Sequence, residues 1–280
     1  MNGQDQNLTL VDRATAGDKA ALELLLASVQ DLVFNLSLRM LGTLPDAQDA
    51  SQEILLKVMT HLSSYRRESA FTTWVFRIAV NHLKDYRKSM FAEHPLSFEV
   101  YGSDIANGRA QDVPDMTQGV DRALLERELK LSCTNVMLQC LDAQSRLIFI
   151  LGTMFRLDSR IAGEVLEMSP EAYRQRLSRT RKKMSEFLAA YCGLSGTGMC
   201  ACGRRVNYAI ASHRIRPDAP DFTRLAERDL RTESFIGAME ALDDASSVFD
   251  SLPYYRTAQG TRQWIEALLQ SDRFETILQA

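Results

Sequence analysis

The densest set of chemically active side chains lies in residues 170–184. Six bases and no acid occur within ten positions there, on the side of a predicted helix opposite Tyr173 and Met184: Arg174, Arg176, Arg179, Arg181, Lys182 and Lys183. Ser169 and Pro170 supply the N-cap and the first helical position. Because a short apolar helix and a tight turn precede it, this helix suits the DNA major groove, where its first turn would reach base edges. A solvated basic helix face would have the same pattern.

A second set is a group of cysteines in the Gly-rich stretch 192–203. Cys192, Cys200 and Cys202 lie there, and His213 follows eleven positions after the last of them. Three thiolates and an imidazole could close a tetrahedral zinc site, although C-x-C is a less common chelating spacing than C-x-x-C. The alternatives are reduced free thiols and a redox-sensitive pair.

The other two cysteines, Cys133 and Cys140, lie seven positions apart on a predicted helix and are expected in the core. The N-terminal residues 1–10 lack the plan of a signal peptide, and no apolar run approaches the roughly 20 residues that span a bilayer. We therefore expect the chain in the reducing cytoplasm, away from the membrane, where an odd number of cysteines favours thiols or a metal over disulfides.

Motifs for enzymatic chemistry are missing from the sequence. It has no phosphate-binding Gly loop, no H-E-x-x-H, no G-x-S-x-G and no C-x-x-C. The four histidines are scattered along the chain: His61, His82, His94 and His213. The sequence therefore predicts a binding protein that is not an enzyme and requires no cofactor.

Composition is that of a soluble globular chain of 280 residues, 25% charged and 45% apolar. It excludes a disordered chain, a collagen-like repeat and a disulfide mini-protein. The net charge of −3 argues against coating nucleic acid by bulk charge. The average conceals a division, because cations gather in residues 65–88 and 174–183 whereas acids gather near residue 46 and in residues 89–119.

The spacing of apolar residues predicts the helices that carry these functional residues. A first helix runs from Asp18 to Met40 and ends at Gly42, and a second helix begins at Pro45. A third helix runs from about residue 72 to 88, with four side chains facing inward: Trp74, Ile78, Leu83 and Tyr86. Since strand-like alternation is absent, we predict an all-α fold of two small helical domains, the second with a helix-turn-helix, and a helical C-terminal extension.

Helical spacing is lost between Ser89 and Gly119, where five acids oppose one base and prolines and glycines are frequent. This composition predicts a mobile acidic linker. Helical spacing resumes over 120–191 and again after 203. The last block has aromatic residues at helical intervals, which favours a small core over a stacking platform: Phe222, Phe235, Phe249, Tyr254, Tyr255, Trp264 and Phe274.

Four fragments in the first domain occur in an order typical of one protein family. They are Ala16-Gly17-Asp18, Arg39-Met40-Leu41-Gly42, Asp46-Ala47-Gln48-Asp49-Ala50 leading into Gln52-Glu53, and Phe71-Thr72-Thr73-Trp74-Val75-Phe76-Arg77-Ile78-Ala79-Val80-Asn81. Over roughly residues 15–190 the chain resembles the extracytoplasmic-function (ECF) sigma factors of bacterial RNA polymerase. The resemblance implies a sigma region 2 domain, an acidic linker, a sigma region 4 domain and a C-terminal extension, over residues 10–89, 90–119, 120–191 and 192–280.

The resemblance also implies roles for individual residues. Docking on the clamp helices of the polymerase largest subunit would use Asp46, Asp49, Gln52 and Glu53, although acids at a solvated helix N-terminus are also favoured by its dipole. Opening and reading the promoter −10 element would use stacking and backbone neutralisation by Tyr65, Arg66, Arg67, Phe71, Asn81, Lys84, Arg87 and Lys88. Reading the −35 element would use Ser169, Glu171, Ala172, Arg174, Gln175 and Arg176, with Arg179 and Lys182 on phosphates.

The chain departs from the family pattern in the second domain. Glu167 stands where the turn usually has Gly, which would cost about 1 kcal/mol if this residue is left-handed. Ala172-Tyr173 replaces the usual Thr-Val pair, so promoter specificity is expected to differ.

The partners expected from the resemblance are core RNA polymerase and promoter DNA. The linker would thread basic channels of the polymerase or act as a plain tether. The C-terminal extension would regulate by docking on the two DNA-binding domains or on a partner, and a separate anti-sigma factor is an alternative partner. The rival hypothesis is a helix-turn-helix regulator that does not join polymerase. That hypothesis does not explain the motifs in residues 46–88.

Overall fold

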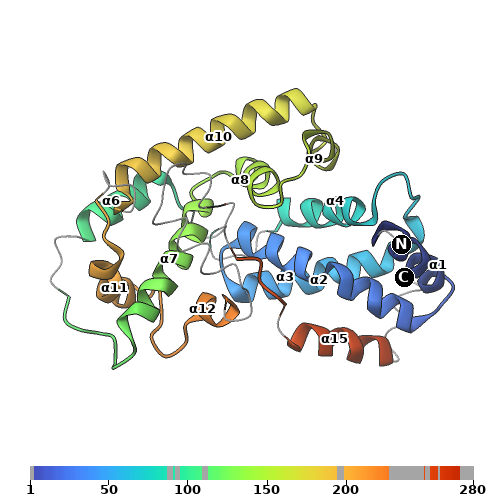
Figure 1. Ribbon diagram of the computed structural model, residues 1–280, viewed down its shortest axis with the longest axis horizontal. Coiled ribbons are helices and arrows are strands. Elements are labelled where there is room, and N and C mark those ends of the chain that lie inside the picture. The colour runs from blue at the N-terminus through green and yellow to red at the C-terminus, as the bar shows by residue number, and fades with distance from the viewer. Residues whose placement is uncertain are drawn as a thin grey trace.

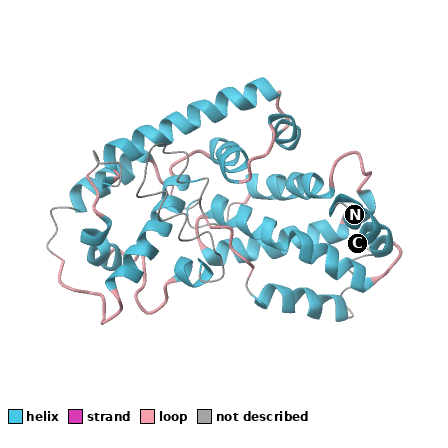
Figure 2. Cartoon of the chain, viewed as in Figure 1, coloured by secondary structure: helices cyan, strands magenta, loops and turns pink. Residues whose placement is uncertain are grey.

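The computed structural model describes residues 3–86, 91, 95–108, 113–193, 199–226, 249, 253–257 and 259–271. Helices joined by loops make up this part of the chain (Figure 2), which contains no strand apart from one isolated bridge pair, Cys192 with Cys200. The all-α prediction is confirmed. In chain order the elements are α1 (Gly3–Thr15), α2 (Lys19–Leu41), α3 (Leu44–Thr60), η1 (Leu62–Ser64), α4 (Phe71–Lys84), α6 (Phe98–Asn107), α7 (Arg122–Gln139), α8 (Ala143–Phe149), the π-helical turn η3 (Ile150–Met154), α9 (Ser159–Leu166), α10 (Pro170–Tyr191), α11 (Cys202–Ala211), α12 (Asp221–Ala226) and α15 (Gln259–Gln270).

The N-terminal block is built around α2, which packs against α1, α3 and α4 (Figure 1). Asp18 caps its start by accepting a hydrogen bond from the Ala21 N–H at 3.1 Å, and Gly42 ends it with a φ of 83°. Both boundaries match the prediction. Among the described helices α2 alone is long and apolar enough to cross a membrane. Its apolar side chains, such as Leu25 and Val29, are buried in the core, so its composition follows from its central position.

Two features of this block differ from the sequence prediction. The polar N-terminal stretch forms α1, which buries Val11 against α2. On α4 the buried residues include Val75 and Ala79, whereas Trp74 and Ile78 are only half-buried. The buried side is broader than one stripe and shifted from the predicted one because α4 packs against α9 as well as α2 and α3.

In the second block, α10 packs on α8 and α9 and lies along the top of Figure 1. Tyr173 and Met184 are buried on it, as predicted. Glu167 ends α9 in the left-handed conformation, with φ 57° and ψ 46°, as the comparison with the family pattern anticipated. Ser169 caps α10 by accepting from the Ala172 N–H at 3.2 Å. The two helices are therefore joined by the tight turn that the sequence predicts.

The prediction of an irregular linker over 90–119 fails for residues 98–107, which form α6. Ser97 caps this helix, and Phe98, Tyr101 and Ile105 bury its apolar side. The Phe98 ring lies 4.9 Å from that of Phe187 on α10. This short helix buries only three large apolar side chains, and the surrounding acids and glycines obscure their spacing in the sequence.

The C-terminal extension packs on the preceding blocks in two places, and four of its residues form a second apolar cluster with Leu125 and Leu129 of α7: Val206, Ala209, Ile210 and Ile215. Its helices α11 and α12 pack on α7, and α15 packs on α2 (Figure 1). The Phe249 ring lies 5.0 Å from that of Phe149 on α8, and Tyr255 is fully buried in the same core. The prediction that these aromatic residues are core residues is confirmed for Phe222, Phe249 and Tyr255, but their rings complete the core of the two preceding blocks. Phe235 and Phe274 lie outside the described residues.

Candidate polymerase- and DNA-binding surfaces

The predicted polymerase-binding residues lie on the first half of α3: Asp46, Asp49, Gln52 and Glu53. Asp49 is exposed and the other three are half-buried. Asp46 also belongs to the helix cap, because the Thr43 hydroxyl donates to its carboxylate at 2.6 Å. A Glu53 carboxylate oxygen lies 3.4 Å from Nε2 of His82 on α4. Two of the acids thus contribute to the local structure as well as to the surface charge.

The three carboxylates lie close to one hydroxyl, that of Tyr86 just after α4. Burial raises the pKa of Tyr86, and the negative charges of Glu53, Asp46 and Asp49 raise it further. The first turns of α3 therefore present three carboxylates near Tyr86, and this negative charge suits electrostatic docking on a basic partner.

The aromatic residues predicted to stack on a promoter base are buried in this conformation. Tyr65 is 8% exposed and Phe71 is 3% exposed. The Tyr65 ring lies 5.6 Å from Phe71 and 5.4 Å from Trp74, and the Tyr65 hydroxyl donates to the Ser69 carbonyl at 2.7 Å. A base could stack here only after the loop over residues 65–70 opens.

The cations of this loop lie at the surface. Arg66 and Arg67 are exposed, and Arg67, whose φ is 62°, forms an ion pair with Asp12 of α1. On α4 Asn81 is exposed and Lys84 is half-buried. Two further predicted contacts lie outside the described residues: Arg87 and Lys88. The loop cations are thus placed for a nucleic-acid backbone, and α1, which the sequence did not predict, holds one of them.

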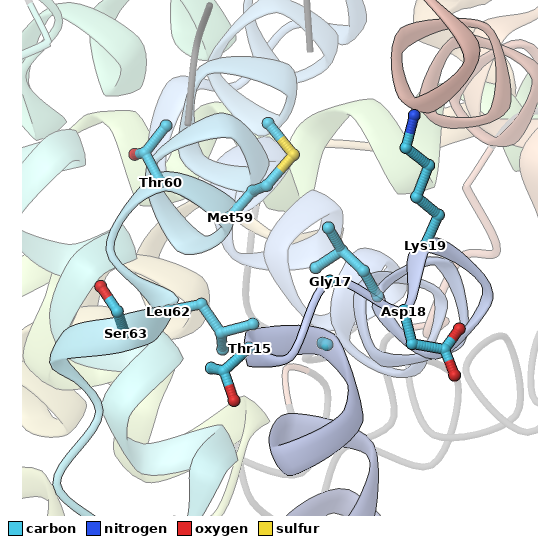
Figure 3. A pocket seen from close by; sticks show the side chains of 10 residues that line it. Thr15, Gly17, Asp18, Lys19, Met59, Thr60, Leu62 and Ser63 are labelled. Atoms are coloured by element: carbon cyan, nitrogen blue, oxygen red, sulfur yellow. The ribbon is translucent and has the colours of Figure 1, made fainter. Parts of the chain in front are cut away.

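A hollow of about 250 Å³ lies beside this loop, between the α1–α2 turn, the end of α3 and η1 (Figure 3). Thr60 and Ser63 lie on one side of it, and Asp18 and Lys19 lie on the other. None of the residues predicted to bind DNA or polymerase lines it. The predicted surfaces are therefore outer faces of helices and a loop rather than a pocket.

The residues predicted to read the −35 element lie along α10. All of them are exposed except the half-buried Ala172: Ser169, Glu171, Arg174, Gln175, Arg176, Arg179 and Lys182. Arg174 donates to the Ser159 hydroxyl at 3.0 Å and to the Glu171 carboxylate at 2.7 Å. Lys182 lies 3.8 Å from the Glu186 carboxylate. The first turns of α10 thus present a row of exposed cations. Ser159 and Glu171 already hold the Arg174 side chain in one orientation.

Arg181 does not lie on this exposed face, contrary to the prediction. It donates to the Thr153 hydroxyl and to the Gly152 carbonyl, each at 3.1 Å. It lies four positions after Leu177 and three before Met184, so helical geometry places it on the buried side. The exposed basic face is narrower than the count of six bases suggests.

The two candidate DNA-binding blocks pack directly on each other, with α4 against α9. Arg77 of α4 lies 3.0 Å from the Glu164 carboxylate of α9. The Phe76 ring lies 5.3 Å from that of Phe155, just after η3. The −10 and −35 surfaces are therefore fixed relative to each other in this conformation.

Residues 253–257 of the extension, here called the latch, contact α2 of the first block, and the Tyr254 ring lies 6.2 Å from that of Phe155 in the second block. Arg39 of α2 is fully buried and donates to Asn135 Oδ1 of α7 at 2.8 Å and to the Pro253 carbonyl at 2.9 Å. Burial lowers the pKa of Arg39. The Asp31 carboxylate accepts from the Thr257 N–H at 2.8 Å and from its hydroxyl at 2.5 Å. The latch thus contacts one side of α2 over two turns.

A second contact joins the extension to α6. Asp104 of α6 accepts from Arg205 at 2.9 Å, from Arg214 at 3.2 Å and from the Tyr208 hydroxyl. Burial disfavours the charge on Arg214, but Tyr101, Cys133 and Asp104 outweigh that effect and raise its pKa. An acid of the predicted free linker is therefore bound by the extension.

The predicted metal ligands are only partly brought together. Cys192, Cys200 and Cys202 line one small cavity, whereas exposed His213 is not among its lining residues. Cys133 of α7, expected in the core, is half-buried and lines that cavity. None of the five cysteines forms a disulfide. In the part of the chain that the structure describes, no three His, Cys, Asp or Glu side chains already form a group that could hold a metal ion.

An all-α chain with an acidic helix, an arginine-rich loop and a basic helix after a tight turn has the surfaces of a transcription initiation factor. The sigma-70 region 2 family matches residues 25–90. The RNA polymerase sigma-H factor of Pseudomonas aeruginosa is 27% identical over 185 residues, which cover 66% of this chain and 95% of that protein. The ECF RNA polymerase sigma factor SigW of Bacillus subtilis is 25% identical over 178 residues, which cover 64% of this chain and 94% of that protein.

The ECF RNA polymerase sigma-E factor of Escherichia coli (strain K12) is 32% identical over 130 residues, which cover 46% of this chain and 67% of that protein. The chain belongs to the ECF sigma factors. It is thus an alternative sigma factor, a transcription initiation factor and not an enzyme. Membership of this family disfavours the rival regulator that does not join polymerase.

Proposed function

We propose that this alternative sigma factor is held compact by its own C-terminal extension until it binds core RNA polymerase in the cytoplasm. The observation that carries the proposal is the latch, which contacts α2 through Asp31, Asn35 and Arg39 while Arg39 also contacts α7. One short segment thus stabilises the packing of the −10 block on the −35 block.

The compact arrangement is incompatible with simultaneous promoter contact by both blocks. The −10 and −35 elements are named for their positions upstream of the transcription start, so they lie about 25 base pairs apart. At 3.4 Å per base pair, this separation is roughly 85 Å of duplex. With α4 packed on α9, the loop at residues 65–70 and the start of α10 cannot reach two sites so far apart. Promoter recognition therefore requires the blocks to separate.

The contacts that must break include a buried charge whose partners, in the part of the chain that the structure describes, are neutral groups. Arg39 donates to an amide and a backbone carbonyl, and its guanidinium lies 5.0 Å from the centre of the Tyr255 ring. Desolvation of a cation is costly, and neutral partners offset it only in part. The closed state is thus stabilised by apolar packing and weakened by this charge, which suits a contact that opens when a stronger partner binds.

In this proposal polymerase binds the surface formed by Asp46, Asp49 and Glu53, and promoter DNA then binds the exposed cations of the loop and of α10. The extension acts within the chain, in the role that a separate anti-sigma factor has for other sigma factors. The α6 helix would leave α10 and α11 when the blocks separate, so that the acidic segment becomes available to a basic channel.

The first test is transcription by core RNA polymerase and the full-length chain, on templates taken from transcripts that rise when the protein is overproduced. The Asp49→Lys variant should lose core binding and transcription, because it reverses an exposed charge on the docking surface. Asp218→Lys, an equal charge reversal at an exposed site before α12, should retain both. Strong binding of the chain to DNA alone, with no association with core enzyme, would contradict the proposal.

A second test separates DNA reading from charge. Arg176→Ala removes an exposed cation from the first turns of α10 and should weaken −35-dependent transcription by about 1–3 kcal/mol if a base contact is lost. Arg204→Ala removes an exposed cation from α11 and serves as the control. If both variants lower transcription equally, Arg176 contributes only its positive charge and makes no specific base contact.

A further inference from the structure

Four of the five cysteines meet at one place in the fold. Cys133 of α7, Cys192 at the end of α10, and Cys200 and Cys202 at the start of α11 line a single cavity of about 30 Å³. The rest of its lining is mostly apolar and comes from α6, α7 and α10. A space of this size, about that of one water molecule, suits a single ion.

The backbone brings two of the thiols together. Cys192 and Cys200 form a bridge pair, in which the Cys200 N–H donates to the Tyr191 carbonyl at 2.8 Å. Gly193 is needed here, since a Cβ at this position would collide with the Cys200 carbonyl oxygen. The chain therefore closes tightly on itself between α10 and α11, next to the cavity.

Cys202 interacts with the other three cysteines. It shares a hydrogen bond with Cys200 and lies within electrostatic range of Cys133 and Cys192. Zn²⁺ binds the thiolate form of cysteine, so its binding releases protons.

Two cations stand beside the cavity. Arg214 donates to the Cys133 sulfur at 3.6 Å, and Lys130 contributes to the lining. A divalent ion with four thiolates carries a net charge of −2. Donors and cations around such a centre stabilise it and orient its ligands.

We propose that Cys133, Cys192, Cys200 and Cys202 form a tetrathiolate site for Zn²⁺ that fastens the beginning of the extension to α7 and α10. Binding converts four thiols and Zn²⁺ into a zinc tetrathiolate and four released protons. The short side chains must turn toward the cavity centre to reach Zn–S distances of about 2.3 Å, since the present conformation is not yet arranged to hold an ion. Cys133 takes the place that the sequence assigned to His213.

Such a site has a structural role, because four protein ligands leave no open position for a substrate. It joins α7, the end of α10 and the start of α11, on the side of the extension remote in sequence from the latch. The extension would then stay attached to the −35 block when the latch leaves α2.

The test measures zinc in the full-length chain purified under reducing conditions. We expect about one Zn²⁺ per wild-type chain, and at least a tenfold weaker binding in Cys133→Ser and Cys202→Ser. Cys140→Ser and His213→Ala are matched controls that should retain the metal, since Cys140 donates instead to the Val136 carbonyl and His213 is exposed. Circular dichroism checks that each variant is folded.

A second measurement does not depend on the variants folding. Co²⁺ added to the reduced, zinc-free wild-type chain should give intense sulfur-to-metal bands and the visible spectrum of a tetrahedral centre. Failure of the reduced wild type to bind Zn²⁺ or Co²⁺, retention of zinc by folded Cys133→Ser, or loss of zinc from His213→Ala would each overturn the proposal. So would the loss of two thiols to peroxide in a chain that binds no metal, because the cluster would then be a redox pair.

Discussion

Asn35 of α2 and Tyr255 of the latch exchange two hydrogen bonds. The Asn35 Nδ2 donates to the Tyr255 carbonyl at 2.6 Å, and the Tyr255 N–H donates to Asn35 Oδ1 at 2.9 Å. Both residues are buried, so one side chain satisfies both backbone groups of residue 255. Asn35 is therefore a position at which truncation of one side chain removes two contacts of the latch.

The first prediction concerns this pair. Asn35→Ala leaves two buried backbone groups without partners, at a cost of about 1–3 kcal/mol each while the latch stays in place. We expect the latch to detach instead, which exposes residues 253–257 to proteases and increases transcription with limiting core polymerase. Gln144→Ala, which removes an exposed amide from α8, is the control. A folded Asn35→Ala variant with wild-type proteolysis and transcription would show that this pair does not hold the closed state.

The second prediction concerns the turn before α10. Glu167 has a φ of 57°, in the left-handed region where Gly has no steric cost. Glu167→Gly should therefore raise the free energy of unfolding by about 0.5–1 kcal/mol, measured by urea denaturation. Ser178→Gly, at an exposed position inside α10, should lower it by a similar amount because Gly is unfavourable within a helix. Equal destabilisation by both variants would mean that the side chain of Glu167 has a stabilising role that the backbone argument omits.

Local features of this fold could be predicted from the sequence because a few neighbouring residues determine them. Asp18, Gly42 and Ser169 set helix ends within a single turn of chain. Asp49 on α3 and the cations at positions 174, 176, 179, 182 and 183 of α10 are exposed where helical spacing placed them. Arg181 is the exception, because its angular position on the helix turns it toward Gly152 and Thr153.

Long-range contacts could not be predicted in this way. Cys133 joins cysteines about 60 or more positions later in the chain, and nothing in its immediate neighbours indicates this. The packing of Phe249 on Phe149 and the binding of Asp104 by Arg205 likewise depend on how the blocks fold together. The packing of Tyr65 on Phe71 and Trp74 closes the loop in this structure, whereas the family resemblance implies the conformation that binds DNA.

The third prediction concerns the attachment of α12 to α7. The buried Glu128 carboxylate accepts from the N–H groups of Asp221 and Phe222 at 3.0 Å, and from the N–H and hydroxyl of Thr223 at 2.7 Å. It thus satisfies the first turn of α12, as a negative charge at a helix N-terminus does. Glu128→Gln turns one acceptor into a donor facing these donors, and should cost about 2–3 kcal/mol.

The measurement is hydrogen exchange by mass spectrometry over residues 221–226, together with thermal unfolding. We expect exchange to increase in α12 before the rest of the chain is affected. Glu126→Gln, on the same helix and 3.5 Å from Lys130, is the matched control and should leave α12 protected. Unchanged protection of α12 in Glu128→Gln would contradict the capping role.

The fourth prediction is a pH dependence within the −35 block. Burial raises the pKa of Tyr173 to about 12, although Arg181 lowers it in part, and the hydroxyl donates to the Ile148 carbonyl at 3.3 Å. In the unfolded chain this group ionises near its ordinary pKa of about 10. Between these two values the unfolded state releases a proton that the folded state keeps, so the contribution of Tyr173 to stability is complete below pH 10 and is lost as the pH rises from 10 toward 12.

Tyr173→Phe removes the titrating group and keeps the ring. At neutral pH it should cost about 0.5–1.5 kcal/mol for the lost hydrogen bond. The difference in unfolding free energy between wild type and variant should shrink as the pH rises above 10, because only the wild type loses stability through this site. Urea denaturation at a series of pH values measures that difference. A difference that stays constant across this range would mean that Tyr173 ionises as readily in the folded block as in the unfolded chain, and that α8 and α10 separate there enough to admit water.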